Sequence, residues 1–322
     1  MDSPKVSILI PTYRQPELVS HAVQSALEQD YKPLEVIVCD DSQDNETKER
    51  LTPFTADARF YYVKNRQRLG RAGNYRQALY QHASGVWVLM LDGDDYLTDP
   101  RFISDAVRVA TQQKGIVFVQ GGGEIRRQTN GGKSELISTR IPRVKRGASV
   151  VRGSDYVKMF PVKRYFLHLT TLFHRETAMK IDFYREDFLS SDLESFMRLA
   201  LHGKVALIER PVGVWLQHGA NAGKKASMEE VIQNGRWADK VAAYAISNNL
   251  LPKRAAERWV LRVRHREMIG VLMREINTLK SQGNSKLDIF NCTIAFLKRF
   301  PRLACHPVLI KKLVCFYLLP RF

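Results

Sequence analysis

The stretch VLMLDGDDYLTDP, from Val88 to Pro100, passes from an apolar run into three aspartates within four positions. The apolar run is typical of a buried strand, and the carboxylates of Asp92, Asp94 and Asp95 follow it directly. Like charges this close raise one another's pKa and destabilise a fold unless positive charge lies among them. Carboxylates on a tight turn suit Mg²⁺ or Mn²⁺ shared with phosphate oxygens. The stretch therefore predicts either a divalent-cation site or a loop whose aspartates cap the next helix.

Outward from this stretch, apolar runs and helical patterns alternate along the first ~100 residues. The runs that resemble buried parallel strands are 5–10, 34–41, 59–65 and 86–91. Helical patterns lie between them, and this alternation predicts a parallel, doubly wound α/β sheet. Thr12, Asp41 and Asp92 each follow a strand. Ligands of open α/β sheets bind at these carboxyl ends of strands, so we expect the three side chains to share one site.

The composition is that of a globular protein with a large excess of positive charge. Lys and Arg number 50 against 33 Asp and Glu, which gives a net charge of +17. Such an excess favours anionic partners. The four cysteines form no C-x-x-C pair, so neither a zinc site nor a redox motif is expected. With no apolar run of ~20 residues and no basic leader, we expect a cytoplasmic protein, soluble or peripheral on the inner face of the cell membrane.

Several ordered motifs, spread over roughly residues 4–220, resemble those of one enzyme family. The motifs are SILIPTYRQPE (7–17), EVIVCDDSQDNET (35–47), RLGRAGNYRQAL (68–79), LMLDGDDYL (89–97) and SSDLESFMRLALHGKVALIERPVGVWLQH (190–218). In order and context they are similar to the family-2 glycosyltransferases, inverting enzymes of the A-type glycosyltransferase fold. The resemblance implies an α/β fold with a Rossmann-like mixed sheet flanked by helices and followed here by a helical C-terminal extension.

The resemblance also implies a donor site for a nucleotide sugar. The expected donor-binding residues are Pro11, Thr12, Tyr13, Asp41, Arg71, Asn74, Asp92 and Asp94, and the expected ligands of Mn²⁺ or Mg²⁺ are Asp94 and His218. The first three would contact the base, Asp41 would accept its imino N–H, and Asp92 would contact ribose or hold the turn. Arg71 and Asn74 lie at a helix start that suits phosphate. Surface charge and loop fixing are the simpler explanations for these two, and a polar-loop role is the alternative for His218.

A second set of residues concerns the acceptor. Asp192 stands at the position of the family's catalytic base, which takes the proton of the attacking hydroxyl and contributes about 10²–10⁴-fold to the rate. Its simpler explanation is an N-cap, because it lies at a helix start. Glu194 is the alternative base. Two positions depart from the family pattern: Ser191 replaces the usual acidic residue before the base, and Leu216 stands where an arginine is usual.

By pattern, the chain divides into three parts. We expect a nucleotide-sugar-binding half at 1–115, an acceptor-binding half of the same catalytic domain at 116–222, and a basic helical region at 223–322. The last contains one helical stripe, made of Leu287, Phe290, Ile294 and Leu297. Lysines and arginines surround this stripe, and basic amphipathic helices bind anionic membranes. The alternative is that the stripe packs on the catalytic domain.

Two other classes of protein share parts of this pattern. The charge of +17 fits a nucleic-acid-binding protein, but no helix-turn-helix, zinc or RNA-binding signature accompanies it. A nucleotidyltransferase would share the nucleotide, but no Gly-rich phosphate loop follows the first strand. We therefore expect an inverting, metal-dependent glycosyltransferase of the hexosyltransferase class. It would transfer sugar from a UDP-sugar to a glycan or lipid-linked glycan of a bacterial surface polysaccharide, without a nucleic-acid partner.

Overall fold

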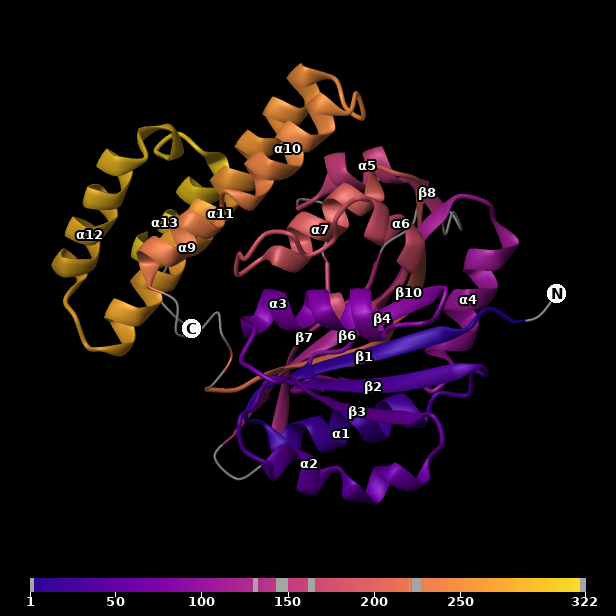
Figure 1. Ribbon diagram of the computed structural model, residues 1–322. Helices are drawn as coiled ribbons and strands as arrows, with labels where there is room; N and C mark the ends of the chain where they lie inside the picture. The colour runs from indigo at the N-terminus through magenta and orange to yellow at the C-terminus, as the bar shows by residue number, and fades with distance from the viewer. Residues whose placement is uncertain are drawn as a thin grey trace.

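A ten-stranded mixed sheet forms the centre of the computed structural model, which describes residues 3–129, 133–142, 150–161, 166–219, 221 and 227–318 (Figure 1). The strands are β1 (Val6–Thr12), β2 (Leu34–Asp40), β3 (Phe60–Lys64), β4 (Trp87–Met90), β5 (Tyr96–Leu97), β6 (Ile116–Gln128), β7 (Ser134–Arg140), β8 (Val150–Arg152), β9 (Thr171–His174) and β10 (Lys204–Gln217). Their order is β3-β2-β1-β4-β9-β6-β10-β5, with β7 beside β6 and β8 beside β10.

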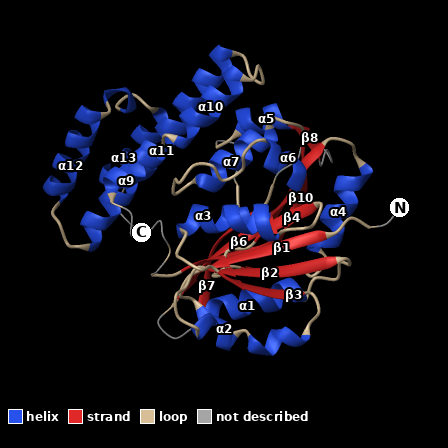
Figure 2. Cartoon of the chain, in the orientation of Figure 1, coloured by secondary structure: helices blue, strands red, loops and turns tan. Residues whose placement is uncertain are grey.

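Helices cover both faces of this sheet (Figure 2). Those before residue 222 are α1 (Pro16–Leu27), α2 (Glu46–Arg50), α3 (Gly70–Gln77), α4 (Phe102–Gln112), α5 (Gly153–Met159), α6 (Arg175–Lys180) and α7 (Ser191–Ala200). Short 3₁₀ turns lie at Thr52–Ala56, His168–Thr170 and Pro301–Leu303, and a π-helical turn at Ala78–His82 follows α3.

The N-terminal part of the sheet is parallel, as the alternating pattern predicts. β1 pairs with β2 and β4, and β2 pairs with β3, all in parallel. Every residue of β1 and β2 is buried, because helices pack on both faces. Along β1, Ile8 shares one core with Val19 of α1, whereas Leu9 shares the opposite core with Tyr75 of α3. The helices α1 and α3 therefore lie on opposite faces.

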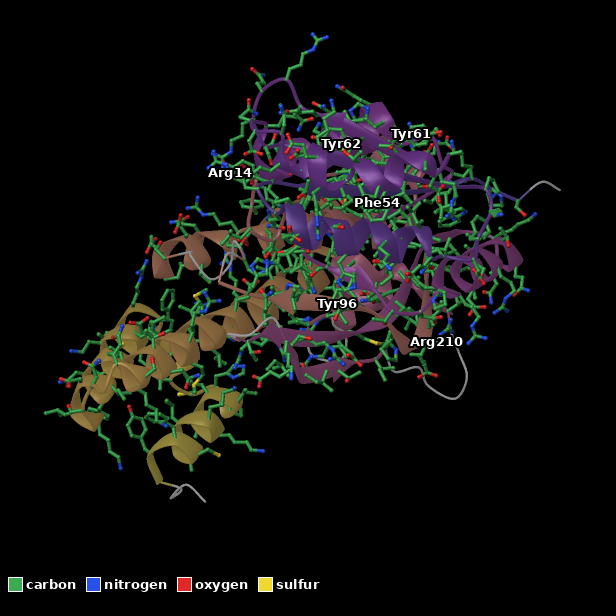
Figure 3. All side chains as sticks on the ribbon, turned by 90° about the horizontal axis from the view of Figure 1, so that it is seen from below. Arg14, Phe54, Tyr61, Tyr62, Tyr96 and Arg210 are labelled. Atoms are coloured by element: carbon green, nitrogen blue, oxygen red, sulfur yellow. The ribbon has the colours of Figure 1, made fainter. Side chains whose placement is uncertain are left out.

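Antiparallel strands enter the sheet beyond β4. β9 runs antiparallel to both β4 and β6, while β10 is parallel to β6. The predicted Rossmann-like mixed sheet, flanked by helices and followed by a helical C-terminal region, is thereby confirmed. β6 and β7 pair as a hairpin, and the turn residues 130–132 between them lie outside the described residues. Arg210 of β10, labelled in Figure 3, pairs with Asp99 and Asp105 and so ties α4 to the sheet edge.

In the described part of the C-terminal region, all regular structure is helical. The α-helices are α9 (Met228–Asn234), α10 (Trp237–Ser247), α11 (Lys253–Ser281), α12 (Lys286–Arg299) and α13 (Pro307–Leu318). Trp237 of α10 and Trp259 of α11 join the catalytic core, where the indole N–H of Trp259 donates to the carbonyl of Phe160 at 3.1 Å. The far half of α11 packs with α12 and α13 around a separate apolar core that includes Leu272 and Phe296. None of the described helices is long and apolar enough to cross a bilayer.

The apolar stripe of α12 is largely exposed. Leu287, Phe290 and Ile294 are 66%, 49% and 37% exposed. The face of α12 that packs on the C-terminal core is instead the one that carries Ile289 and Phe296. In Figures 1 and 3, α12 and α13 lie away from the sheet. The stripe therefore does not pack on the sheet and its helices. Its last member, Leu297, is partly buried in the C-terminal core.

Candidate donor and acceptor site

A pocket of about 820 Å³ opens at the carboxyl ends of β1, β2 and β4. Nine of the expected site residues line it: Pro11, Thr12, Tyr13, Asp41, Arg71, Asn74, Asp92, Asp94 and Asp192. The tenth, His218, hydrogen-bonds to Asp94. Because parallel strands end at a common edge, residues far apart in sequence meet here. The hydroxyl of Thr12 is buried and has no hydrogen-bond partner among the described residues.

Asp41 holds the loop that enters α3. Its carboxylate accepts the backbone N–H groups of Leu69 and Gly70 at 2.8 and 2.9 Å. It also accepts the side-chain amide of Asn65 at 3.0 Å. Hydrogen bonds to a carboxylate are stronger than neutral ones, so Asp41 fixes the start of α3 against the end of β2. The side chain remains part of the pocket wall, where the base of a nucleotide was expected.

Arg71 and Asn74 also join elements rather than stand free. The guanidinium of Arg71 donates to the carbonyls of Phe188 and Leu189 at 2.7 and 2.6 Å, which ties α3 to the loop before α7. The amide of Asn74 donates to the carbonyl of Cys39 at 2.9 Å, in agreement with a loop-fixing role. Arg71 thus lies in the pocket wall, where it connects α3 to the loop before α7.

Each aspartate of the acidic turn has its own hydrogen-bond donor. The hydroxyl of Tyr75 donates to Asp92 at 2.5 Å, and the backbone N–H of Leu216 donates to Asp95 at 3.0 Å. Burial, together with the charge of Asp94, raises the pKa of Asp92 to about 7. Burial also raises the pKa of Asp95 well above its usual range. The repulsion among these carboxylates is therefore reduced by donors from α3 and β10, as well as by any bound cation.

A glycine is required between the first two aspartates. A Cβ at Gly93 would lie 2.9 Å from the side chain of Thr12 and 3.2 Å from the carbonyl of Pro11. The backbone N–H of Gly93 donates to that same carbonyl at 3.1 Å. The acidic turn therefore packs directly against the end of β1, which brings Asp92 and Asp94 beside the expected nucleotide-binding residues.

Asp94 is paired with two side chains that follow β10. One of its oxygens lies 2.8 Å from Nε2 of His218 and accepts the side-chain amide of Asn221 at 3.0 Å. Carboxylate and imidazole are both ligands that Mn²⁺ accepts. Among the described residues no group of three or more His, Cys, Asp or Glu side chains could hold a metal ion. A cation held by Asp94 and His218 would therefore need its remaining ligands from substrate and water.

The two carboxylates near the start of α7 have different environments. Glu194 is fully buried and accepts two bonds from the guanidinium of Arg198, at 2.7 and 2.9 Å. Asp192 is partly exposed and lines the pocket. It occupies the second position of α7, after the N-cap Ser190, and accepts no hydrogen bond from the described residues. The capping explanation for Asp192 is therefore wrong, and only Asp192 of the two is available to a ligand.

Several residues that line the pocket were not predicted from the sequence. They are Arg68, Tyr75, His168, Trp215, Asn221, Arg266 and Arg274. Tyr75 lies inside a motif of the family resemblance, yet its contact with Asp92 depends on the packing of α3. Burial lowers the pKa of His168 to about 4, so this histidine is neutral at pH 7. Arg266 and Arg274 belong to α11, where no motif or spacing links them to the sheet edge.

Comparison with known proteins supports the same interpretation. The family model "Glycosyl transferase family 2" matches residues 7–166. The chain is 33% identical over 131 residues to a GalNAc(5)-diNAcBac-PP-undecaprenol beta-1,3-glucosyltransferase of Campylobacter jejuni, covering 39% of this chain and 40% of that protein. It is 36% identical over 95 residues to the UDP-Glc:alpha-D-GlcNAc-diphosphoundecaprenol beta-1,3-glucosyltransferase WfgD of Escherichia coli, covering 30% and 37%. The matched region is thus about two fifths of each relative's length.

Solved structures share the fold at low sequence identity. S. aureus TarS in complex with UDP has a TM-score of 0.61 and 18% identity, covering 82% of this chain and 72% of that chain. The mannosyltransferase PcManGT from Pyrobaculum calidifontis, in complex with GDP-Man and Mn²⁺, has a TM-score of 0.55 and 20% identity, covering 98% and 87%. The fold is therefore the A-type glycosyltransferase fold. With the match over residues 7–166, this part of the chain is a glycosyl transferase family 2 domain.

Proposed function

We propose that this protein is an inverting, metal-dependent glycosyltransferase that moves a sugar from a UDP-sugar to a hydroxyl of a glycan or lipid-linked glycan. The observation that carries the proposal is one pocket lined both by Asp94, which bonds to His218 behind it, and by the carboxylate of Asp192, which accepts no hydrogen bond from the described residues. A transferase needs these two functions, one for the leaving group and one for the attacking hydroxyl, within the length of a substrate.

The donor would lie along the ends of β1, β2 and β4. Tyr13 offers an aromatic face, with the guanidinium of Arg68 4.5 Å from its ring centroid. The unpaired hydroxyl of Thr12 and the fixed carboxylate of Asp41 are available to the base. In the comparison structures UDP is bound by TarS and GDP-Man with Mn²⁺ by the mannosyltransferase. The named substrate of WfgD favours UDP for this chain.

Asp94 and His218 would hold the metal, with diphosphate oxygens as further ligands. When bound, Mn²⁺ or Mg²⁺ supplies positive charge beside the oxygens of the leaving diphosphate. Asn221 donates to Asp94 and so orients its carboxylate. Tyr75 holds Asp92 on the other side of the turn, where its carboxylate faces the pocket.

Asp192 would take the proton of the acceptor hydroxyl. A general base must reach the proton directly, and Asp192 lines the pocket without a competing hydrogen bond from the described residues. Attack from the face opposite the leaving diphosphate inverts the anomeric carbon. Neutral His168 and the guanidinium of Arg71 lie close enough for the charge of Asp192 to act on their pKa values.

The acceptor side would lie at a membrane, on its cytoplasmic face. Exposed apolar side chains of α12 and α13 make up what we call the α12–α13 face: Leu287, Phe290, Ile294, Ile310 and Val314. The two helices meet where the rings of Phe290 and Tyr317 lie 6.3 Å apart. Between residues 285 and 318 there are six Lys and Arg against one acidic residue, Asp288. Apolar side chains among positive charges suit the surface of an anionic bilayer.

A donor screen tests the proposal. The protein with Mn²⁺ is offered UDP- and GDP-linked sugars and a crude lipid-linked acceptor, and nucleotide release is measured together with the anomeric configuration of the product. We expect release from a UDP-sugar, abolished by chelator, and a β product from an α-linked donor. A retained configuration or transfer that persists in chelator would contradict the mechanism. Stabilisation by duplex DNA in place of UDP would favour a nucleic-acid-binding protein. Nucleotidyl transfer to a sugar phosphate would favour a nucleotidyltransferase.

A further inference from the structure

Helix α11 brings two arginines into the pocket from outside the catalytic domain. Arg266 and Arg274 line the same pocket as Asp192, and Gly270 lies midway between them. Residues spaced by four lie on one face of a helix, and eight residues correspond to about 12 Å along its axis. The two arginines are therefore neighbours on one face of α11, about two turns apart.

The space between these arginines is open to a ligand. Both side chains are exposed, and a Cβ at Gly270 would meet no atom within 4 Å. Arg266 makes no hydrogen bond or ion pair with any described residue. Arg274 also lines a second, more open hollow of about 830 Å³ with Arg127 and Gln217. An anion can therefore approach α11 between the two guanidinium groups. The space that it would occupy is part of the pocket.

Packing fixes α11 relative to Asp192. The opposite face of α11 is buried through Met268 and Leu272 in the C-terminal core, which α9 also joins. Asn234 of α9 accepts the backbone N–H of Ser190 at 2.9 Å and donates to its hydroxyl at 2.8 Å. Ser190 is the N-cap of the helix that carries Asp192. Packed elements therefore connect the helix of the two arginines to the helix of the proposed base, in the wall of one pocket.

In the proposed function, on which this inference rests, the donor diphosphate lies with the cation at Asp94 and His218. Arg266 and Arg274 come from a different element, and the donor diphosphate would not need them to neutralise its charge. Leu193 of α7 and Val231 of α9 add apolar surface to the same pocket. We infer that Arg266 and Arg274 form a second anion subsite, which binds the diphosphate of an acceptor whose far end is a hydrocarbon chain.

Calorimetry with a simple prenyl diphosphate tests this subsite. The full chain is first saturated with UDP and Mn²⁺ so that the donor site is filled, and farnesyl diphosphate is then titrated. Each arginine that donates to a diphosphate contributes a charge-assisted hydrogen bond, so Arg266→Gln with Arg274→Gln should weaken binding on the order of 100-fold. The matched control is Arg254→Gln with Arg258→Gln, which removes the same charge from exposed positions of α11 outside the pocket.

The arms separate the possible ligands. We expect the wild type and the control pair to bind farnesyl diphosphate alike, within about threefold, and farnesol not at all. Inorganic pyrophosphate should bind more weakly than farnesyl diphosphate, since it lacks the hydrocarbon. Equal losses in both variant pairs, or no binding by the wild type, would overturn the inference. So would a loss of UDP affinity in the Arg266/Arg274 variant, which would assign the arginines to the donor. Failure of the wild type to bind UDP with Mn²⁺ would instead contradict the proposed function itself.

Discussion

The proposed donor and acceptor sides of the pocket differ in how several of their polar side chains are held. On the donor side, Asp41, Asn74 and Asp94 each make two or more hydrogen bonds to other elements. On the acceptor side, Asp192 and Arg266 make none with the described residues. Bonded groups are positioned before a ligand arrives, whereas unbonded groups are left for the ligand to satisfy. The comparison indicates that Asp41, Asn74 and Asp94 are held in place by the fold, whereas Asp192 and Arg266 are left for a substrate to satisfy.

The largest expected effect tests the unbonded acceptor side. Asp192→Asn keeps the shape but removes the proposed base, so kcat should fall about 10²–10⁴-fold. Affinity for UDP with Mn²⁺, measured by calorimetry, should stay near that of the wild type.

Glu194→Gln is the matched control for this substitution, because it changes a carboxylate on the same helix. Its pair with Arg198 is buried, so this change should lower the melting temperature while the folded enzyme keeps its kcat. A kcat loss in Glu194→Gln as large as that in Asp192→Asn would reassign the base.

The next effect tests the bonded donor side. Asp94→Asn removes the charge that would hold the cation, and loss of one electrostatic stabiliser of the transition state costs about 10²–10³-fold in rate. Transfer should fall by that factor, and the dependence of UDP affinity on Mn²⁺ should weaken. Wild-type rates in Asp94→Asn, or full activity after chelation, would contradict the metal assignment. Asp105→Asn, outside the pocket, is the control for removing an acidic residue of the same domain.

Most of the donor side could be predicted from the sequence, because it depends on local pattern. Apolar runs give the parallel strands, and the ends of those strands place Thr12, Asp41 and Asp92 at one edge. The contacts that hold these residues could not be predicted. Asn65 bonds to Asp41 across the ends of β3 and β2, and the bonds of Asn65 to Asn74 and of Tyr75 to Asp92 form only when α3 packs on the sheet. Tertiary contacts of this kind have no periodicity in the sequence.

The proposed acceptor side shows more clearly what the sequence alone cannot predict. The motif placed Asp192 near a helix start, but its position after the N-cap decides that its side chain is free for a ligand. For the C-terminal region, helical spacing found the apolar stripe of α12 but not its environment. An amphipathic pattern shows which side chains share a face, whereas the element that covers that face depends on the whole fold. The position of Arg266 and Arg274 in the pocket also depends on the whole fold, so the sequence pattern could not predict it.

A smaller effect is expected at the α12–α13 face. Lys311 and Lys312 lie on α13 beside its exposed apolar side chains. Each lysine near an anionic surface contributes about 1 kcal/mol, so replacing both with Gln should weaken binding to anionic vesicles about 30-fold. Flotation with phosphatidylglycerol vesicles at low salt measures this loss. Lys48→Gln with Lys114→Gln, on the exposed surface of the catalytic domain, should change binding little. Equal losses in both pairs would indicate attraction by net charge alone, and no binding by the wild type would contradict the membrane proposal.

The smallest effect concerns the junction between the catalytic domain and the C-terminal helices. Glu267 of α11 accepts the indole N–H of Trp237 at 2.7 Å, and its other oxygen is buried without a hydrogen-bond partner among the described residues. Burial raises the pKa of Glu267 from 4.5 to about 7, and the charge of Asp239 adds to the rise. Between these two values the folded chain keeps a proton that the unfolded chain has released. The free energy of unfolding therefore falls as the pH rises through this range and levels off above it.

Glu267→Gln should remove this dependence, because a neutral amide can still accept the bond from Trp237. At pH 5 the variant and the wild type should unfold at similar temperatures. At pH 8 the variant should be more stable by about 1–2 kcal/mol, a shift of a few degrees in melting temperature. Asp239→Asn is the control, since that carboxylate already pairs with Arg264 at the surface and should change the slope only slightly. A variant that is less stable than the wild type at pH 8 would mean that the folded chain stabilises the ionised carboxylate, and that the junction has a cationic partner for it.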